Sequence, residues 1–153
     1  MAAEHEFKSV FGRPATHVAD AGGRVNLIGE HTDYHDGFVF PAALDLRTRV
    51  AAAPRDDGEV RVWSANLRRF AGGALTALSP PDTLDWSAYV LGPFWALRES
   101  GRPVRGADVW LHGEVPLGGG LSSSASIEVA LVGVAAAIAG GEIAPMDAAM
   151  AAK

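Results

Sequence analysis

The stretch Gly113-Glu-Val-Pro-Leu-Gly-Gly-Gly-Leu-Ser-Ser-Ser-Ala-Ser126 decides how the rest of the chain folds around it. Residues 107–112 before it read as a strand, and the almost wholly apolar residues 127–139 after it predict a buried helix. Three consecutive glycines let the backbone turn tightly and approach a ligand closely. The serines follow at the helix start, where unpaired N–H groups and the helix dipole favour an anion such as phosphate. We interpret the stretch as a phosphate loop, and the simpler alternative is a glycine-rich turn with a serine N-cap.

The loop does not follow the common phosphate-binding or nucleophile motifs. The P-loop pattern requires a lysine, and none occurs between Lys8 and Lys153. The Rossmann pattern fails because Leu121 and three serines follow the glycines. A nucleophile elbow requires glycine where Ser124 stands. The sequence therefore favours a less common loop, in which serine hydroxyls and backbone amides contact the phosphates.

The composition is typical of a globular protein with one sizeable core. Hydrophobic residues make up 48% and charged residues 20% of the 153 positions, which excludes a disordered chain. The net charge of −5 argues against nucleic acid or an anionic membrane as the main partner. Because the chain has no cysteine, disulfides, thiolate zinc sites and cysteine nucleophiles are excluded. The first residues are charged and the apolar run 129–139 is too short to span a bilayer, so we expect a cytoplasmic protein.

Periodicity and turn residues predict strands and helices in a mixed order. The expected helices are residues 4–11, residues 86–100 after an Asp85 N-cap, residues 127–139 and a last helix from Pro145. The expected strands are residues 16–19, 24–28, 38–40, 46–53, 60–63 and 107–112, with turns at 20–23 and 54–58. The second turn predicts that residues 60–63 are a hairpin partner of the preceding strand. The expected fold class is α+β, a mixed sheet backed by helices within one unit, residues 1–153.

A second stretch, residues 23–36, concentrates charged and imidazole side chains between apolar strands, and loops of this kind often carry functional residues. Arg24 offers a bidentate fork to phosphate. Glu30, His31 and Asp33 are suited to hydrogen-bonding the adjacent hydroxyls of a sugar. Two alternatives remain open. One is a transition-metal site formed by His31, Asp33, His35 and Asp36. The other is a solvated loop in which Arg24 pairs with Glu30 or Asp33.

The two stretches together resemble motifs of the galactokinases. Residues 23–34, Gly-Arg-Val-Asn-Leu-Ile-Gly-Glu-His-Thr-Asp-Tyr, resemble the galactokinase signature. Residues 116–126, Pro-Leu-Gly-Gly-Gly-Leu-Ser-Ser-Ser-Ala-Ser, resemble the ATP-binding motif of the wider GHMP kinases, which include mevalonate and homoserine kinases. The motifs lie in the family's order and near its spacing, so the resemblance covers nearly the whole chain. Gly22 stands where the family usually has proline, which we expect to loosen the turn before the signature.

This resemblance implies the N-terminal half of a two-domain GHMP kinase fold. The implied reaction transfers the γ-phosphoryl group of ATP to the C1 hydroxyl of α-D-galactose with Mg²⁺. Arg24 would stabilise the charge on the transferring phosphoryl group. The other implied site residues are Glu30, His31 and Asp33 for the sugar, Gly118, Gly119, Gly120, Ser122, Ser123 and Ser124 for the phosphates, Ser124 also for Mg²⁺, and Trp86 and Leu117 for adenine. For Trp86 and Leu117 the alternative is ordinary core packing.

In the family that the chain resembles, the general base is an aspartate and a glutamate helps to hold Mg²⁺, and both would lie beyond Lys153. We therefore expect a galactokinase fragment, truncated at the C-terminus and inactive by itself, whose partner is the C-terminal half. The alternatives are a non-catalytic galactose and ATP sensor, a kinase of a related sugar such as N-acetylgalactosamine, and a metal-dependent hydrolase. The intact Ser124-Ala125 pair favours an enzyme over a sensor, and the unchanged residues 30–33 favour galactose.

Overall fold

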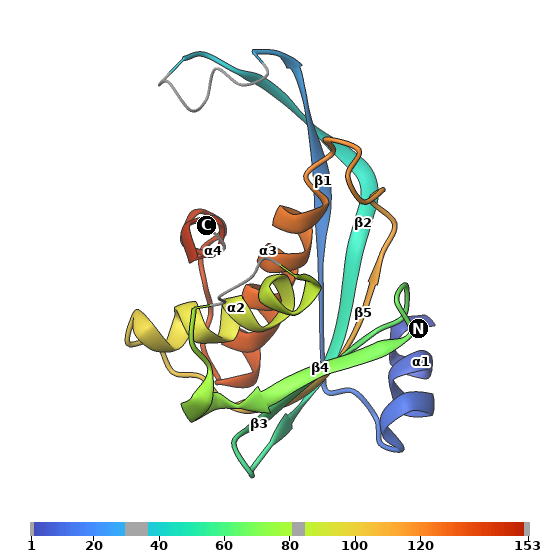
Figure 1. Cartoon of the computed structure of the whole chain (residues 1–153), viewed down its shortest axis with the longest axis vertical. Coiled ribbons are helices and arrows are strands. Elements are labelled where there is room, and N and C mark those ends of the chain that lie inside the picture. Colours follow the sequence, from blue (N-terminus) through green and yellow to red (C-terminus); the bar gives the residue numbers. More distant parts are fainter. Residues whose placement is uncertain (1, 30–36, 81–84, 152–153) are drawn as a thin grey trace.

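The strands of the protein pair in one sheet that has helices on both faces (Figure 1). A computed structural model describes residues 2–29, 37–80 and 85–151. The helices are α1 (Ala2–Phe11), the short 3₁₀ helix η2 (Leu75–Ala77), α2 (Trp86–Glu99), α3 (Ser123–Ile138) and α4 (Pro145–Ala151). The strands are β1 (His17–Ile28), β2 (Phe40–Arg55), β3 (Glu59–Ser64), β4 (Arg69–Ala74) and β5 (Gly106–Gly113).

The sheet is mixed, with the strand order β1-β2-β5-β3-β4. The pairs β1–β2, β2–β5 and β3–β4 are antiparallel, whereas β3 and β5 run parallel. The parallel pair requires a crossover, which α2 provides between β4 and β5. The expected α+β class with a mixed sheet backed by helices is therefore confirmed.

Alternating residues of β2 contribute to two different cores. Val50 and Ala52 pack on the face that carries α2 and α3, while Ala51 and Ala53 pack with Phe7 of α1 on the opposite face. This follows from the two-residue period of a strand, which sends successive side chains to opposite faces. Figure 1 shows α1 on one side of the sheet and the other three α-helices on the other. Because both faces are covered, residues 50–53 read as a continuous small apolar run.

Helix α3 is apolar on nearly every side because other elements surround it. Leu131, Val132 and Val134 point in different directions, yet all three are fully buried. The helix packs against β1 and β2 on one side and against α2 and α4 on others. A helix enclosed in this way needs no polar stripe along its middle, which accounts for the long apolar segment in the sequence.

On the face that carries α1, the buried carboxylate of Asp108 in β5 joins four segments. Its side chain is 3% exposed. It accepts hydrogen bonds from Arg13 at 2.7 Å, from Arg55 at 2.9 Å and from Arg61 at 2.9 Å. Burial by itself raises the pKa of Asp108, but the hydrogen bonds from Arg61, Arg55 and Arg13 outweigh burial and hold the pKa below its ordinary value. The network fixes the end of α1 to β2, β3 and β5.

Three details of the expected strand pattern are wrong. The predicted turn at residues 20–23 lies within β1. Of the strand predicted at 38–40 only Phe40 is in a strand, and it belongs to the same strand, β2, as residues 46–53. Long-range pairing between β1 and β2 overrides the local turn residues, and the register of the pair shifts between Gly22 and Arg24. Gly22 therefore lies in a strand, not in a turn. A Cβ atom at Gly22 would lie 3.0 Å from the carbonyl oxygen of Leu44.

The predicted hairpin between residues 46–53 and 60–63 is also wrong. β3 pairs with β4 and, in parallel, with β5, and it does not adjoin β2. Strand β4 was not predicted, because its composition Arg-Phe-Ala-Gly-Gly-Ala carries little strand propensity. The helices α1, α2 with its Asp85 N-cap and α4, and the strand β5, are close to where they were expected, whereas α3 begins at Ser123, before the expected start at residue 127. Within the described residues, no helix is long and apolar enough to cross a bilayer.

Candidate functional site

The glycine-rich loop turns through three left-handed residues before α3 begins. Gly118 has φ 73° and Gly120 has φ 69°, a region that glycine occupies without steric cost. Ser122 has φ 59° and ψ 41°, which is uncommon for a residue with a side chain. A non-glycine residue held in this conformation indicates that the loop conformation is set by its surroundings.

The first turn of α3 keeps its backbone donors available. Ser122 occupies the N-cap position, but its side chain makes no capping hydrogen bond. The first intrahelical bond runs from the Ser126 N–H to the Ser122 carbonyl, at 3.0 Å. The N–H groups of Ser123, Ser124 and Ala125 therefore have no partner within the helix. A serine stands at the N-cap, as the simpler alternative expects, but its side chain does not bond these N–H groups, which could therefore donate to an anion.

Two buried hydroxyls fix this turn of α3 to the sheet. The Ser126 hydroxyl donates to the Ser123 carbonyl at 2.8 Å and lies 2.7 Å from the hydroxyl of Thr48 in β2. Since the Ser126 proton is used on Ser123, the Thr48 hydroxyl donates to Ser126. Thr48 and Ser126 are 1% and 2% exposed, respectively. The sequence did not single out Thr48, because nothing near it in the chain signals a partner 78 residues away.

The signature strand and the glycine-rich loop touch directly. The backbone N–H of Arg24 donates to the carbonyl of Leu121 at 3.1 Å. Gly23 permits this approach, because a Cβ atom there would lie 2.9 Å from the Leu121 oxygen. The Arg24 side chain is half-buried and makes no hydrogen bond or ion pair with another described residue. Within the described residues, its guanidinium therefore has no partner that would compete with an anion.

A buried acceptor lies two residues after Arg24 in β1. Asn26 is 9% exposed, and its Oδ1 accepts no hydrogen bond from the described part of the protein. Leaving such an acceptor unsatisfied costs about 1–3 kcal/mol, which a hydrogen bond from a bound molecule or a water would offset. The orphaned acceptor therefore fits a polar ligand at this end of β1.

The remaining residues proposed for the sugar, Glu30, His31 and Asp33, lie outside the described residues. The alternative metal site at His31, Asp33, His35 and Asp36 lies there too. Among the residues that the structure does describe, no group of three carboxylate or imidazole side chains is arranged to hold a metal ion.

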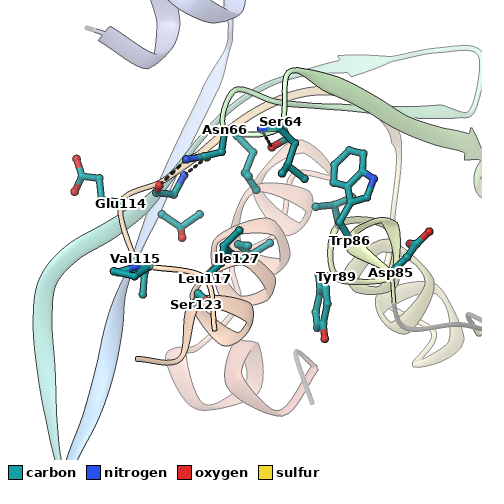
Figure 2. Close-up of a pocket in the computed structure, with 16 residues that line it drawn as sticks. Ser64, Asn66, Asp85, Trp86, Tyr89, Glu114, Val115, Leu117, Ser123 and Ile127 are labelled. Carbon is teal, nitrogen blue, oxygen red and sulfur yellow. Dashed lines mark hydrogen bonds between the residues drawn. The ribbon is translucent and has the colours of Figure 1, made fainter. Parts of the chain in front are cut away.

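A cavity of about 400 Å³ opens beside the loop, between α2 and the start of α3 (Figure 2). Its size falls in the range of roughly 300–1,000 Å³ that small ligands occupy. Figure 2 shows Trp86 and Tyr89 from α2 on one side and Val115, Leu117 and Ile127 on the other. Trp86 is half-buried and Leu117 is 67% exposed, so core packing does not account for Leu117. Ser123 also lines the cavity, which places an apolar chamber beside the open turn of α3.

Asn66 shapes one wall of this cavity and was not predicted from the sequence. Its amide nitrogen donates to the Gly113 carbonyl at 2.9 Å, and its Oδ1 accepts from the Gly113 N–H at 2.8 Å. The side chain thus pairs with Gly113 as a neighbouring strand would, at the point where β5 ends and the loop begins. No local pattern marks Asn66, because its role depends on a residue 47 positions away.

Glu128, in the second turn of α3, is an ionisable group that lies close in the chain to the glycine-rich loop. Burial raises the pKa of Glu128 from 4.5 to about 7. Its carboxyl makes no hydrogen bond with another described residue, so nothing offsets its partial loss of contact with water.

Two family models and several curated proteins match this chain. The family model described as the galactokinase galactose-binding signature matches residues 5–54, and the model of the GHMP kinase N-terminal domain matches residues 88–153. A galactokinase of Chloroflexus aggregans is 50% identical over 125 residues, which are 82% of this chain and 32% of that protein. A galactokinase of Chloroflexus aurantiacus matches to the same extent. The chain belongs to the galactokinase family.

A solved galactokinase has the same architecture. The galactokinase of Lactococcus lactis, crystallised in complex with galactose, has a TM-score of 0.84 and 35% sequence identity. The match covers 99% of this chain and 40% of that one. A mevalonate kinase of Methanococcus jannaschii, with a TM-score of 0.76 and 19% identity, shares the fold, and that match covers 89% of this chain and 44% of the kinase. The chain spans about a third of the length of the curated galactokinases that it matches.

Proposed function

We propose that this galactokinase-family chain supplies the part of the enzyme that holds ATP and presents it to galactose. The proposed reaction transfers the γ-phosphoryl group of ATP to the C1 hydroxyl of α-D-galactose. The proposal rests on one contact, the hydrogen bond from the Arg24 N–H to the Leu121 carbonyl. That bond joins the strand of the sugar signature to the loop expected to hold the phosphates, so donor and acceptor would meet at one place.

In this proposal the described residues have separate roles. The glycines 118–120 and the open N–H groups of Ser123 and Ser124 bind the phosphates, and the cavity beside Trp86 and Leu117 holds the adenine. The Arg24 guanidinium, which has no partner among the described residues, stabilises the charge that develops on the transferring phosphoryl group. Glu30, His31 and Asp33 hydrogen-bond the sugar hydroxyls.

The chain offers a partial fit to Mg²⁺. The Ser124 hydroxyl lies in the open turn of α3 and makes no hydrogen bond with another described residue. A hydroxyl oxygen suits Mg²⁺, which usually takes one or two protein ligands and completes its shell with phosphate oxygens and water. When bound there, Mg²⁺ neutralises charge on the phosphates. Because the described residues offer no carboxylate cluster, we propose that a further ligand and the general base come from polypeptide equivalent to the rest of the relatives' length.

The test is nucleotide binding by the 153-residue chain, measured by calorimetric titration. We expect the chain to bind Mg²⁺–ATP. Ser124→Ala should weaken this binding several-fold, but it should leave the binding of ATP in excess EDTA almost unchanged. Ser9→Ala, at an exposed position on α1, is the matched control. A wild-type chain that binds no ATP would refute the nucleotide role.

The sugar part of the proposal is tested by a turnover assay with galactose, glucose and N-acetylgalactosamine. The chain by itself is expected to form galactose 1-phosphate many orders of magnitude more slowly than an ordinary kinase, since we propose that the general base lies outside it. Any activity detected should prefer galactose and should disappear in Arg24→Met. Ordinary turnover by this chain, or a preference for another sugar, contradicts the proposal.

A further inference from the structure

An arginine lies over the indole ring of Trp86. The guanidinium carbon of Arg69, at the start of β4, lies 4.8 Å from the centroid of the Trp86 ring. Trp86 lines the cavity and Arg69 does not. Arg69 therefore covers a part of the indole that is turned away from the cavity, and the ring surface toward the cavity stays available.

Arg69 also acts on the residue before Trp86. Asp85 caps α2 by accepting a hydrogen bond from the Ser87 N–H at 2.7 Å. The pKa of Asp85 is lowered mainly by its hydrogen bonds from the Ser87 hydroxyl and N–H, and the positive charge of Arg69 adds a smaller effect. Arg69 thus interacts with both the cap and the first residue of α2. Both of these residues line the cavity, so one exposed arginine on β4 lies beside a wall of the proposed adenine site.

We propose that Arg69 is a positioning residue for the purine base of the nucleotide. It holds the Trp86 indole in one orientation, so that its open surface is ready to stack on the adenine. An indole already held in place loses less side-chain freedom when a base binds. A cation over a tryptophan ring is a favourable pair even at an exposed position. This inference rests on the proposed nucleotide role, and it assigns to Arg69 a part in recognition of the base, not of the phosphates.

The experiment measures binding of the base separately from binding of the phosphates. Adenosine, ATP and inorganic tripolyphosphate are titrated into the full chain and into Arg69→Met. We expect Arg69→Met to lower the affinity for adenosine and for ATP by the same factor, about two- to fivefold, which corresponds to roughly 0.5–1 kcal/mol of binding free energy. Tripolyphosphate affinity should not change. Arg105→Met is the charge-matched control, since it removes another exposed arginine, which pairs with Asp56 and does not line the cavity.

A double-mutant cycle tests the route through Trp86. In a Trp86→Ala background, Arg69→Met should no longer change adenosine affinity, and Arg69→Lys in the natural background should show an intermediate loss.

The other outcomes overturn the proposal or separate it from the nucleotide role. If Arg69→Met lowers the affinity for ATP and tripolyphosphate but not for adenosine, Arg69 acts only through its charge, and the proposal is overturned. If Arg69→Met binds all three ligands more weakly by the same factor and melts at a lower temperature, Arg69 has a general structural role, and the proposal is overturned too. If the wild-type chain binds adenosine and Arg69→Met binds it equally well, only this inference fails. If the wild-type chain binds neither adenosine nor ATP, the proposed nucleotide role fails with it.

Discussion

At the scale of single residues, Glu128 has an acid–base property with a measurable consequence for stability. Its carboxyl is partly withdrawn from water on α3, and the pKa of Glu128 is raised to about 7. The folded state therefore binds a proton more tightly than the unfolded chain, in which the ordinary pKa is 4.5. By linkage, the protein loses stability as the pH rises from 4.5 through 7, and the loss is complete above pH 7.

We predict that Glu128→Gln removes this pH dependence. At pH 8 the variant should be more stable than the natural chain by on the order of 1 kcal/mol, a figure reduced because the side chain keeps partial contact with water. At pH 4 the two should be nearly equal. The measurement is urea denaturation at a series of pH values, with Glu142→Gln, an exposed glutamate, as the control. A Glu128→Gln variant whose stability falls between pH 5 and 8 as steeply as that of the natural chain contradicts this prediction.

At the scale of elements, the approach of β1 to the glycine-rich loop depends on Gly23. A Cβ atom there would lie 2.9 Å from the Leu121 carbonyl oxygen and 3.1 Å from a methyl group of Val115. Backbone atoms move less readily than the end of a side chain, so the loop itself has to shift. Such a shift would break the hydrogen bond between Arg24 and Leu121, which is the contact that the functional proposal depends on.

Gly23→Ala is therefore predicted to lower the free energy of unfolding by about 1–3 kcal/mol and to weaken ATP binding. The matched control is Gly133→Ala in α3, where the added Cβ atom would meet only the Ala19 methyl group, at 3.9 Å. In a helix interior the control should be neutral or stabilising by up to about 1 kcal/mol. Urea denaturation and ATP titration of both variants provide the measurement. If Gly23→Ala unfolded at the same urea concentration and bound ATP with the same affinity as the natural chain, the loop would not depend on this close approach.

At the scale of the whole molecule, the far ends of β1 and β2 extend beyond the helices as a hairpin arm (Figure 1), here defined as residues 25–28 and 40–43. The arm exposes large apolar side chains, with Ile28 72% and Phe40 60% exposed. These two residues are directly paired across the strands. A cluster of this kind is typical of a surface that another chain or domain covers.

We predict that the 153-residue chain self-associates through the hairpin arm. Replacing Ile28 and Phe40 together by threonine, which keeps strand propensity, should shift the chain toward the monomer without lowering its melting temperature. The control is the pair Met146→Thr and Met150→Thr on α4, which are also exposed, at 73% and 63%. Sedimentation velocity over a range of concentrations measures the change. A natural chain that stays monomeric at high concentration contradicts the prediction.

Local signals in the sequence determined much of this protein. The helix starts at Asp85 and Pro145, the buried helix α3 and the glycine-rich turn before it could all be predicted, because capping, glycine conformation and hydrophobic period act over a few residues. The two motifs, residues 23–34 and 116–126, also indicate the family by themselves. These features depend on neighbours in the chain, and neighbours are what a sequence shows.

Only the tertiary structure decided which distant residues meet. The pairing of β3 with β4 and β5, the bond between Asn66 and Gly113, and the Arg69–Trp86 contact each join residues that no local pattern connects. The predicted turn at residues 20–23 failed for the same reason, since pairing along β2 outweighs the preference of two glycines for a turn. Strand pairing and side-chain contacts are settled by the packing of the whole core, so the sequence determined the glycine-rich loop and the fold determined the cavity beside it.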